Sequence, residues 1–202
     1  MIMSEKDFKI ICVTNRRLCR EDFLLRLHKI AAARPDAIML REKDLPPVVY
    51  RDLARRVQEI CRFYGVSCIW HTYFAAETEF LHLPRPLWQQ YNLSPGVPLP
   101  ALGVSCHSLA EAVAAAAGGC AWLTAGHIFM TDCKPGLPAR GLDFLRQICR
   151  AEDVNIPVYA IGGVKPENIA QVKAAGAQGA CVMSGFMRCA EPAALLAALR
   201  AN

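Results

Sequence analysis

The chain has 202 residues, of which 53% are hydrophobic and 20% are charged, so it is long enough for one well-filled core but short for two. Its net charge of +5 is spread over several helical patterns, which argues against a nucleic-acid-binding surface. No apolar run approaches the ~20 residues that a membrane span needs, and residues 1–9 are too polar for a signal peptide. We therefore expect one cytoplasmic domain over residues 1–202, with no membrane or nucleic-acid partner.

Eight short apolar runs are predicted to be strands. Each is hydrophobic throughout instead of alternating with polar residues, as a strand buried on both faces requires. In chain order they are residues 10–13, 37–40, 66–70, 80–83, 102–104, 122–124, 158–161 and 180–183. Helical patterns lie between or after them at residues 21–33, 47–64, 108–117, 142–150, 166–175 and 192–201. The segment 84–100 contains five prolines and is expected to hold at most a short helix.

The order of these elements predicts the fold class. A strand followed by a helix, repeated about eight times, is typical of an α/β fold of the (β/α)8 type, the TIM barrel. A doubly wound open sheet is the alternative. We favour the barrel because the repeats continue regularly to the C-terminus.

Ten cysteines raise the question of disulfides or zinc. They are scattered over predicted strands, helices and loops, and no Cys-x-x-Cys pair occurs. We therefore expect free thiols in a reducing compartment and no zinc site.

In a barrel of this kind the active site lies at the carboxyl ends of the strands. The residues expected around that rim are Arg41, Glu42, Lys43, His71, Ser105, His107, His127, Gly162, Gly163, Ser184 and Gly185. Gly162-Gly163 and Ser184-Gly185 follow the last two strands, where backbone N–H groups and a helix N-terminus commonly bind phosphate. Ordinary tight turns are the alternative, but two such turns in register favour a phosphate site.

The loop at residues 126–141 contains a histidine, an aspartate, a cysteine, a lysine and an arginine between a predicted strand and a predicted helix. Its His127 stands at the strand end, and an imidazole can move protons at neutral pH. Hydrogen bonding at the strand end is the alternative role for this side chain. Arg41 and Lys43 can likewise either attract an anionic group or form local ion pairs with their acidic neighbours.

Several segments together resemble the thiamine phosphate synthase/TenI superfamily, in the family's order and over nearly the whole chain. These segments are residues 40–44, 103–108, 126–141, 160–168 and 182–185. Synthases of that family join a pyrimidine pyrophosphate to a thiazole phosphate, with Mg²⁺ held by aspartates after the third and fourth strands. This chain has His71-Thr72 and the Leu-Pro-Arg-Pro segment 83–86 at those places. It looks more like TenI-type thiazole tautomerases, which share the Gly-His-aliphatic-Phe pattern of residues 126–129.

The tautomerase resemblance implies an isomerase of thiamine biosynthesis that aromatises a thiazole carboxylate phosphate by proton transfer, with no metal and no other cofactor. It implies that His127 is the catalytic residue. The residues expected to bind the substrate and its phosphate are Arg41, Lys43, His107, Lys134, Gly162, Gly163, Ser184 and Gly185. Two alternatives stay open: a thiamine phosphate synthase, and a non-catalytic regulatory protein that binds thiazole phosphate. The expected partner is the small phosphorylated thiazole; the oligomeric state is left open, with a homodimer among the options.

Overall fold

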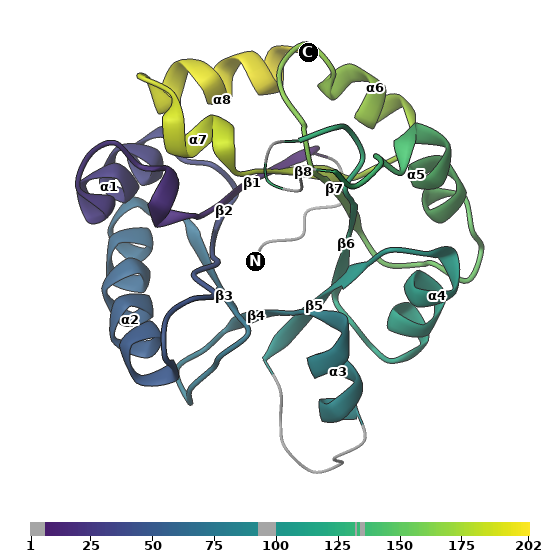
Figure 1. Ribbon diagram of the computed structural model, residues 1–202, viewed down its shortest axis with the longest axis horizontal. Coiled ribbons are helices and arrows are strands. Elements are labelled where there is room, and N and C mark those ends of the chain that lie inside the picture. The colour runs from purple at the N-terminus through teal and green to yellow at the C-terminus, as the bar shows by residue number, and fades with distance from the viewer. Residues whose placement is uncertain (1–6, 93–99, 132, 134–135) are drawn as a thin grey trace.

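The computed structural model describes residues 7–92, 100–131, 133 and 136–202, which form a closed barrel of parallel strands (Figure 1). The strands are β1 (Lys9–Val13), β2 (Ala37–Leu40), β3 (Ser67–His71), β4 (Phe80–Leu83), β5 (Ala101–Cys106), β6 (Trp122–Gly126), β7 (Val158–Ile161) and β8 (Gly179–Val182). Each strand pairs with the next along the chain, and β8 pairs with β1 to close the ring. The expected TIM barrel is confirmed, because an open sheet would leave its two outer strands unpaired with each other.

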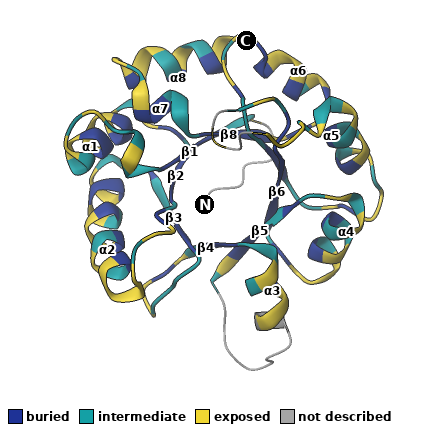
Figure 2. Cartoon of the chain, in the orientation of Figure 1, coloured by how far each residue is buried: buried dark blue, intermediate teal, exposed yellow. Residues whose placement is uncertain are grey.

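The helices surround the ring of strands (Figure 1). They are α1 (Phe23–Ala33), α2 (Pro47–Tyr64), α3 (Arg85–Asn92), α4 (Leu109–Ala117), α5 (Gly141–Cys149), α6 (Ile169–Ala174), α7 (Ser184–Arg188) and α8 (Pro192–Ala201), and a 3₁₀ turn η1 (Arg16–Leu18) follows β1. Figure 2 shows that the helices bury the faces that they turn to the strands and expose the opposite faces. No described helix combines the length and the apolar character that crossing a membrane requires.

Several helix ends follow directly from the sequence. The carboxylate of Asp22 accepts a hydrogen bond of 2.9 Å from the backbone N–H of Leu25 and caps α1. Ser108 caps α4 through the N–H of Glu111, as the Ser-x-x-Glu pattern indicates. After α2, Gly65 adopts a left-handed conformation with φ of +67°, which costs glycine little and ends the helix.

The hydrophobic core has two parts. The larger part lies between the strands and the helices and includes Leu27, Val57, Trp70, Leu145 and Phe186. The smaller part fills the barrel with side chains from alternate strand positions, including Val13, Met39, Ile69, Trp122 and Tyr159. Gly103 makes room for the Trp122 indole, since a Cβ at this glycine would lie 2.1 Å from Trp122 Cε2.

The strands agree with the predicted runs to within a few residues, and β5 and β6 extend further, to Cys106 and Gly126. The helix predicted at 166–175 begins only at Ile169, because a turn closed by Asn168 precedes it. The Asn168 amide accepts from the N–H of Lys165 and donates to the carbonyl of Gly163, both at 2.9 Å. All ten cysteines are free thiols, as the sequence indicates.

Candidate functional site

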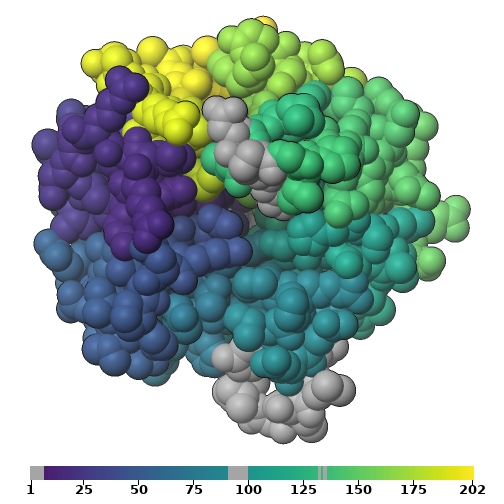
Figure 3. Space-filling model, viewed as in Figure 1, coloured from purple at the N-terminus to yellow at the C-terminus, as the bar shows by residue number. Residues whose placement is uncertain are grey.

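A cavity of about 680 Å³ opens at the carboxyl ends of the strands. Figure 3 looks onto this end, where the loop after β6, in green, lies beside a hollow near the centre of the face. Of the predicted rim residues, the cavity is lined by Arg41, Lys43, His71, Ser105, His107, His127, Gly162, Gly163 and Ser184. Lys134, also predicted to bind substrate, lies outside the described residues. Glu42 and Gly185 are predicted at the same rim, but neither lines the cavity. Gly185 instead packs against β8, since a Cβ there would lie 3.0 Å from Val182 Cγ1.

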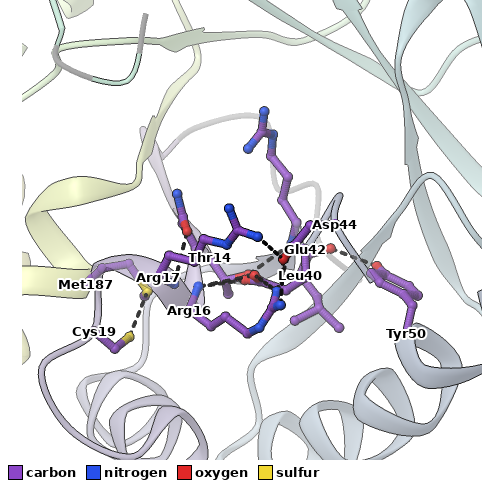
Figure 4. A network of polar contacts seen from close by, with 11 residues as sticks. Thr14, Arg16, Arg17, Cys19, Leu40, Glu42, Asp44, Tyr50 and Met187 are labelled. Atoms are coloured by element: carbon purple, nitrogen blue, oxygen red, sulfur yellow. Dashed lines mark hydrogen bonds and ion pairs between the residues drawn. The ribbon is translucent and has the colours of Figure 1, made fainter. Parts of the chain in front are cut away.

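The carboxylate of Glu42 is buried between the ends of β1 and β2 (Figure 4). It accepts a hydrogen bond of 2.7 Å from the Thr14 hydroxyl and bonds of 3.0 and 3.2 Å from the backbone N–H of Arg16. Successive residues of an extended segment point to opposite sides. Burying Glu42 therefore leaves Arg41 and Lys43 directed toward the cavity that both of them line.

The guanidinium of Arg16 joins two acidic groups at this edge (Figure 4). It lies 3.1 Å from Glu42 Oε2 and donates to both carboxylate oxygens of Asp44 at 2.6 Å. Hydrogen bonding to Arg16 holds the pKa of Asp44 well below its usual range, so this carboxylate stays ionised near neutral pH. The rim from β1 to β2 is thus held by a charged network outside the cavity.

Tyr50 of α2 links the ends of β2 and β3. Its hydroxyl donates to the backbone carbonyl of Leu40 and accepts from the backbone N–H of His71, both at 2.7 Å. Burial raises the pKa of this phenol, which therefore stays protonated and able to donate. One buried hydroxyl thus holds the backbone of the residue before Arg41 and the backbone of His71.

The floor of the cavity is polar but uncharged. His82 Nε2 lies 2.9 Å from Ser105 Oγ and 3.4 Å from Thr124 Oγ1, and the His71 and His82 rings lie 5.7 Å apart. Burial lowers the pKa of His82 to about 3 and the pKa of His71 well below its ordinary value, with the mutual repulsion of the two rings adding to the shift of His71. Both imidazoles are neutral at physiological pH, so His71, Ser105 and Thr124, which line the cavity floor, offer hydrogen bonds without a charge.

The loop after β6 runs along the end of β7 before α5. The backbone N–H groups of Ile128 and Phe129 donate to the carbonyls of Ile161 and Gly162 at 2.9 and 3.0 Å. His127, only 6% exposed, lines the cavity, and its Nε2 lies 3.2 Å from the carbonyl oxygen of Leu137. Because a carbonyl can only accept, Nε2 is the protonated nitrogen in this arrangement.

Gly162 and Gly163 pass close to that loop, with φ of +98° and +69°. A Cβ on Gly162 would lie 2.2 Å from His127 Cβ, and one on Gly163 would lie 2.7 Å from the carbonyl oxygen of Met130. Packing alone therefore requires glycine at both positions. Their role in phosphate binding stays a prediction.

At the end of β8, Ser184 begins α7 and lines the cavity, as does the exposed Arg188. The last turn of α7 is held by the buried Arg26 of α1. Its Nε donates to the carbonyl of Phe186 at 2.9 Å, its Nη2 contacts the same carbonyl and that of Cys189, and Glu21 pairs with it at 3.3 Å. Helix α1 thus fixes the position of α7.

Three charged residues at the rim are missing from the predicted site: Arg85, Glu111 and Arg188. Arg85 begins α3, with Pro84 between it and the end of β4, and its Nη1 forms an ion pair with Glu111 Oε1. Glu111 Oε2 accepts from the backbone N–H of His107 at 2.6 Å and lies 3.5 Å from His107 Nδ1. Burial opposes ionisation of Glu111, but these donors outweigh it and lower its pKa. Arg85 could have been predicted at the rim from the sequence, because it comes just after a predicted strand, as the other predicted rim residues do.

Comparison with known proteins identifies the family. A family described as "Thiamine monophosphate synthase" matches residues 10–186. A protein of Moorella thermoacetica named "Thiamine-phosphate synthase" is 38% identical over 175 residues, covering 81% of this chain and 80% of that protein. The "Putative thiamine-phosphate synthase 2" of Aquifex aeolicus is 32% identical over 89% of this chain and 97% of its own length. The solved "Thiamine phosphate pyrophosphorylase from Pyrococcus furiosus" superposes with a TM-score of 0.81 at 26% identity, covering 96% of this chain and 94% of that one.

The tautomerase function expected from the resemblance is wrong, because these relatives are named as synthases and as a pyrophosphorylase. The expectation relied on two missing carboxylates and on a short motif around His127. Both are local features of the rim, whereas the similarity to proteins named as synthases extends over most of the chain. The His127 imidazole, moreover, is hydrogen-bonded to the Leu137 carbonyl of its own loop. The superfamily-level resemblance, in contrast, is confirmed: the chain belongs to the thiamine monophosphate synthase family.

Proposed function

We propose that this chain is a thiamine-phosphate synthase, which joins a pyrimidine pyrophosphate to a thiazole phosphate. In that reaction the bond between the pyrimidine methylene carbon and a pyrophosphate oxygen breaks, and its electron pair leaves with pyrophosphate. The lone pair of the thiazole nitrogen forms the new carbon–nitrogen bond, so no oxidant or reductant is needed. The observation that supports the proposal most directly is one cavity with anion-attracting groups at two separate parts of its rim, in a chain 38% identical to a protein of that name.

Two phosphorylated substrates need two anion sites. The closed strand order puts β7 and β8 across the barrel from β3 and β4, so the turns after β7 and β8 lie across the mouth from Arg85, which follows β4; Arg41 and Lys43 follow β2, two strands from β8. We assign the thiazole phosphate to Gly162, Gly163 and Ser184, where backbone N–H groups can approach the oxygens. We assign the pyrophosphate to the side of Arg41 and Lys43. The cavity of about 680 Å³ falls within the range of about 300–1,000 Å³ that is usual for small-molecule sites.

The two rings would then lie over the uncharged floor. His71, Ser105 and Thr124 line the cavity there and can donate or accept hydrogen bonds. A neutral floor suits heterocycles, because a fixed charge beneath them would have to be desolvated on binding. His107 and His127 follow the neighbouring strands β5 and β6 and both line the cavity, and we assign both to substrate positioning.

The resemblance to synthases implies Mg²⁺, which prefers hard oxygen ligands such as one or two carboxylates together with substrate phosphates. Among the described residues, no group of three or more His, Cys, Asp or Glu side chains could hold a metal ion. Glu111 is the single carboxylate in the described lining, and it is already paired with Arg85. These residues do not fit the ion, and we derive no step through it.

The test is turnover of the purified chain with both substrates, with thiamine phosphate and released pyrophosphate measured by mass spectrometry and a coupled assay. We expect the two products in equal amounts and neither product when one substrate is omitted. Arg41→Gln should slow turnover about 10- to 100-fold, because a charge-assisted hydrogen bond is worth about 1.5–3 kcal/mol. Arg56→Gln, an exposed change on α2, should leave it unchanged. No coupling with both substrates present, in EDTA and in Mg²⁺ alike, would refute the synthase assignment.

A further inference from the structure

The edge of the cavity formed by β4 and β5 contains an arginine with unused hydrogen-bonding capacity. The Arg85 side chain is 31% exposed and lines the cavity. Its Nε is buried and has no hydrogen-bond partner within the described part of the chain. An unpaired buried donor is costly, and a shift of the side chain toward an acceptor in the cavity would remove the cost.

The charge balance around the cavity favours an anion with several negative charges. The described lining contains the cationic side chains Arg41, Lys43, Arg85 and Arg188 but one carboxylate, Glu111. Three of these cations follow β2 and β4, on the side assigned above to pyrophosphate. A cavity wall with this excess of positive charge attracts phosphate and repels a divalent cation.

We propose that Arg85 binds the pyrophosphate leaving group and supplies positive charge that a carboxylate-held Mg²⁺ would otherwise provide, so that pyrophosphate binding to this chain does not depend on the metal. The inference rests on the proposed function. A guanidinium presents its N–H groups in a planar fork that matches two phosphate oxygens. As the carbon–oxygen bond breaks, negative charge grows on the pyrophosphate, and a fixed cation beside it stabilises that charge.

Glu111 can release Arg85 without disturbing its own helix. Its Oε2 is held by the backbone N–H of His107 at 2.6 Å, whereas Oε1 pairs with Arg85 Nη1. An anion can therefore replace Oε1 at Arg85 while the bond at the start of α4 remains. Glu111 therefore competes with such an anion for the Arg85 guanidinium.

The binding test uses inorganic pyrophosphate and isothermal titration calorimetry on the full chain, in EDTA and in excess Mg²⁺. We expect binding in EDTA, with an affinity that Mg²⁺ does not improve. Arg85→Gln should weaken it about 10- to 100-fold, as expected for loss of charge-assisted hydrogen bonds, and Arg85→Lys should restore part of the loss. Glu111→Gln, which keeps an acceptor for His107, should tighten binding, and the matched charge control Arg56→Gln should leave it unchanged.

Three results would overturn the inference: pyrophosphate that binds only with Mg²⁺, an Arg85→Gln chain that binds like the unaltered protein, or a loss equalled by Arg56→Gln. Circular dichroism of each variant separates misfolding from lost binding. The turnover assay distinguishes this failure from failure of the proposed function. If the chain couples the two substrates only with Mg²⁺ and does not need Arg85, the synthase assignment stands and the proposed role of Arg85 is refuted. If the chain binds pyrophosphate through Arg85 in EDTA but never forms thiamine phosphate, the role of Arg85 in binding stands and the synthase assignment is refuted.

Discussion

The hydroxyl of Thr14 donates a hydrogen bond of 2.7 Å to Glu42 and accepts one of 2.9 Å from the backbone N–H of Arg41. One side chain of β1's carboxyl end thus fixes two consecutive residues that follow β2. This pairing decides which side of the segment is buried: Glu42 turns into the wall, and Arg41 lies at the cavity. The orientation of the proposed pyrophosphate side therefore depends on a residue that the ligand does not touch.

Thr14→Val should destabilise the fold by about 1–3 kcal/mol, because it removes both hydrogen bonds and leaves the buried Glu42 carboxylate one donor short. It should also weaken pyrophosphate binding, since Arg41 is no longer held. Urea unfolding and calorimetry measure the two effects. Thr14→Ser keeps the hydroxyl and should retain most of both; equal losses for Val and Ser would show that the hydroxyl contributes no more than the methyl group.

Tyr50→Phe should cost about 1–3 kcal/mol, because it leaves the Leu40 carbonyl and the His71 N–H without their buried partner. The substrate KM should rise more than kcat falls, since Arg41 and His71 are positioned by these two backbone groups. Tyr64→Phe, at the other end of the same helix, is the matched control. If both variants unfold at the same urea concentration as the unaltered chain, the bridge has no measurable role.

Gly162→Ala should be far more destabilising than Gly119→Ala. Both glycines have positive φ, +98° and +76°, so both substitutions cost about 1–2 kcal/mol of backbone strain. Only at Gly162 would the added Cβ meet another atom, His127 Cβ, at 2.2 Å; Gly119 has open space. Thermal unfolding of the two variants measures the difference, which we expect to exceed the strain itself. Similar losses would mean that the loop around His127 moves aside freely.

Stability should fall as the pH drops from about 6.5 toward 4.5. The pKa of His82 is lowered to about 3 in the folded chain, and that of His71 is also lowered. Below an unfolded-state pKa of about 6.5, the unfolded chain therefore binds protons that the folded chain does not, and each histidine costs up to about 1.4 kcal/mol per pH unit. Urea unfolding at several pH values measures this slope.

His82→Gln should flatten the slope in that range, which lies above the titration of most carboxylates. His28→Gln, an exposed change on α1, should leave it as it is. A stability that is constant from pH 6.5 to 4.5 in the unaltered chain would contradict the neutral, buried state of both rings.

The barrel was predictable because its signals are local and repeated. Runs such as residues 37–40 and 158–161 are hydrophobic throughout, and the structure places β2 and β7 at those same residues. The capping pattern at Ser108 likewise depends on residues three apart. Each repeat supplies its own evidence, so the weak signal of the proline-rich segment 84–100, where the structure has the expected short helix α3, does not change the fold.

The site was less predictable because its decisive contacts join residues far apart in sequence. Nothing near Glu42 indicates that Thr14, 28 residues earlier, turns it away from the cavity. The pair of Arg85 and Glu111 joins the residues after two different strands, so Arg85 looked like part of a proline-rich loop and Glu111 like a helix cap. The error about the reaction had a related cause, since a motif at His127 cannot outweigh similarity spread over most of the chain.

The distribution of thiols has a practical consequence for anyone who studies this protein. Of ten cysteines, Cys133 alone is exposed, and it lies on the lining of the cavity. Burial raises the pKa of thiols such as Cys106 and Cys181 to about 12, which suppresses their reactive thiolate forms. A maleimide dye should therefore attach at Cys133 first and place a fluorophore beside the mouth without any engineered residue. The labelling rate, slowed when a ligand covers the sulfur, would report occupancy of the cavity even for compounds that are never turned over.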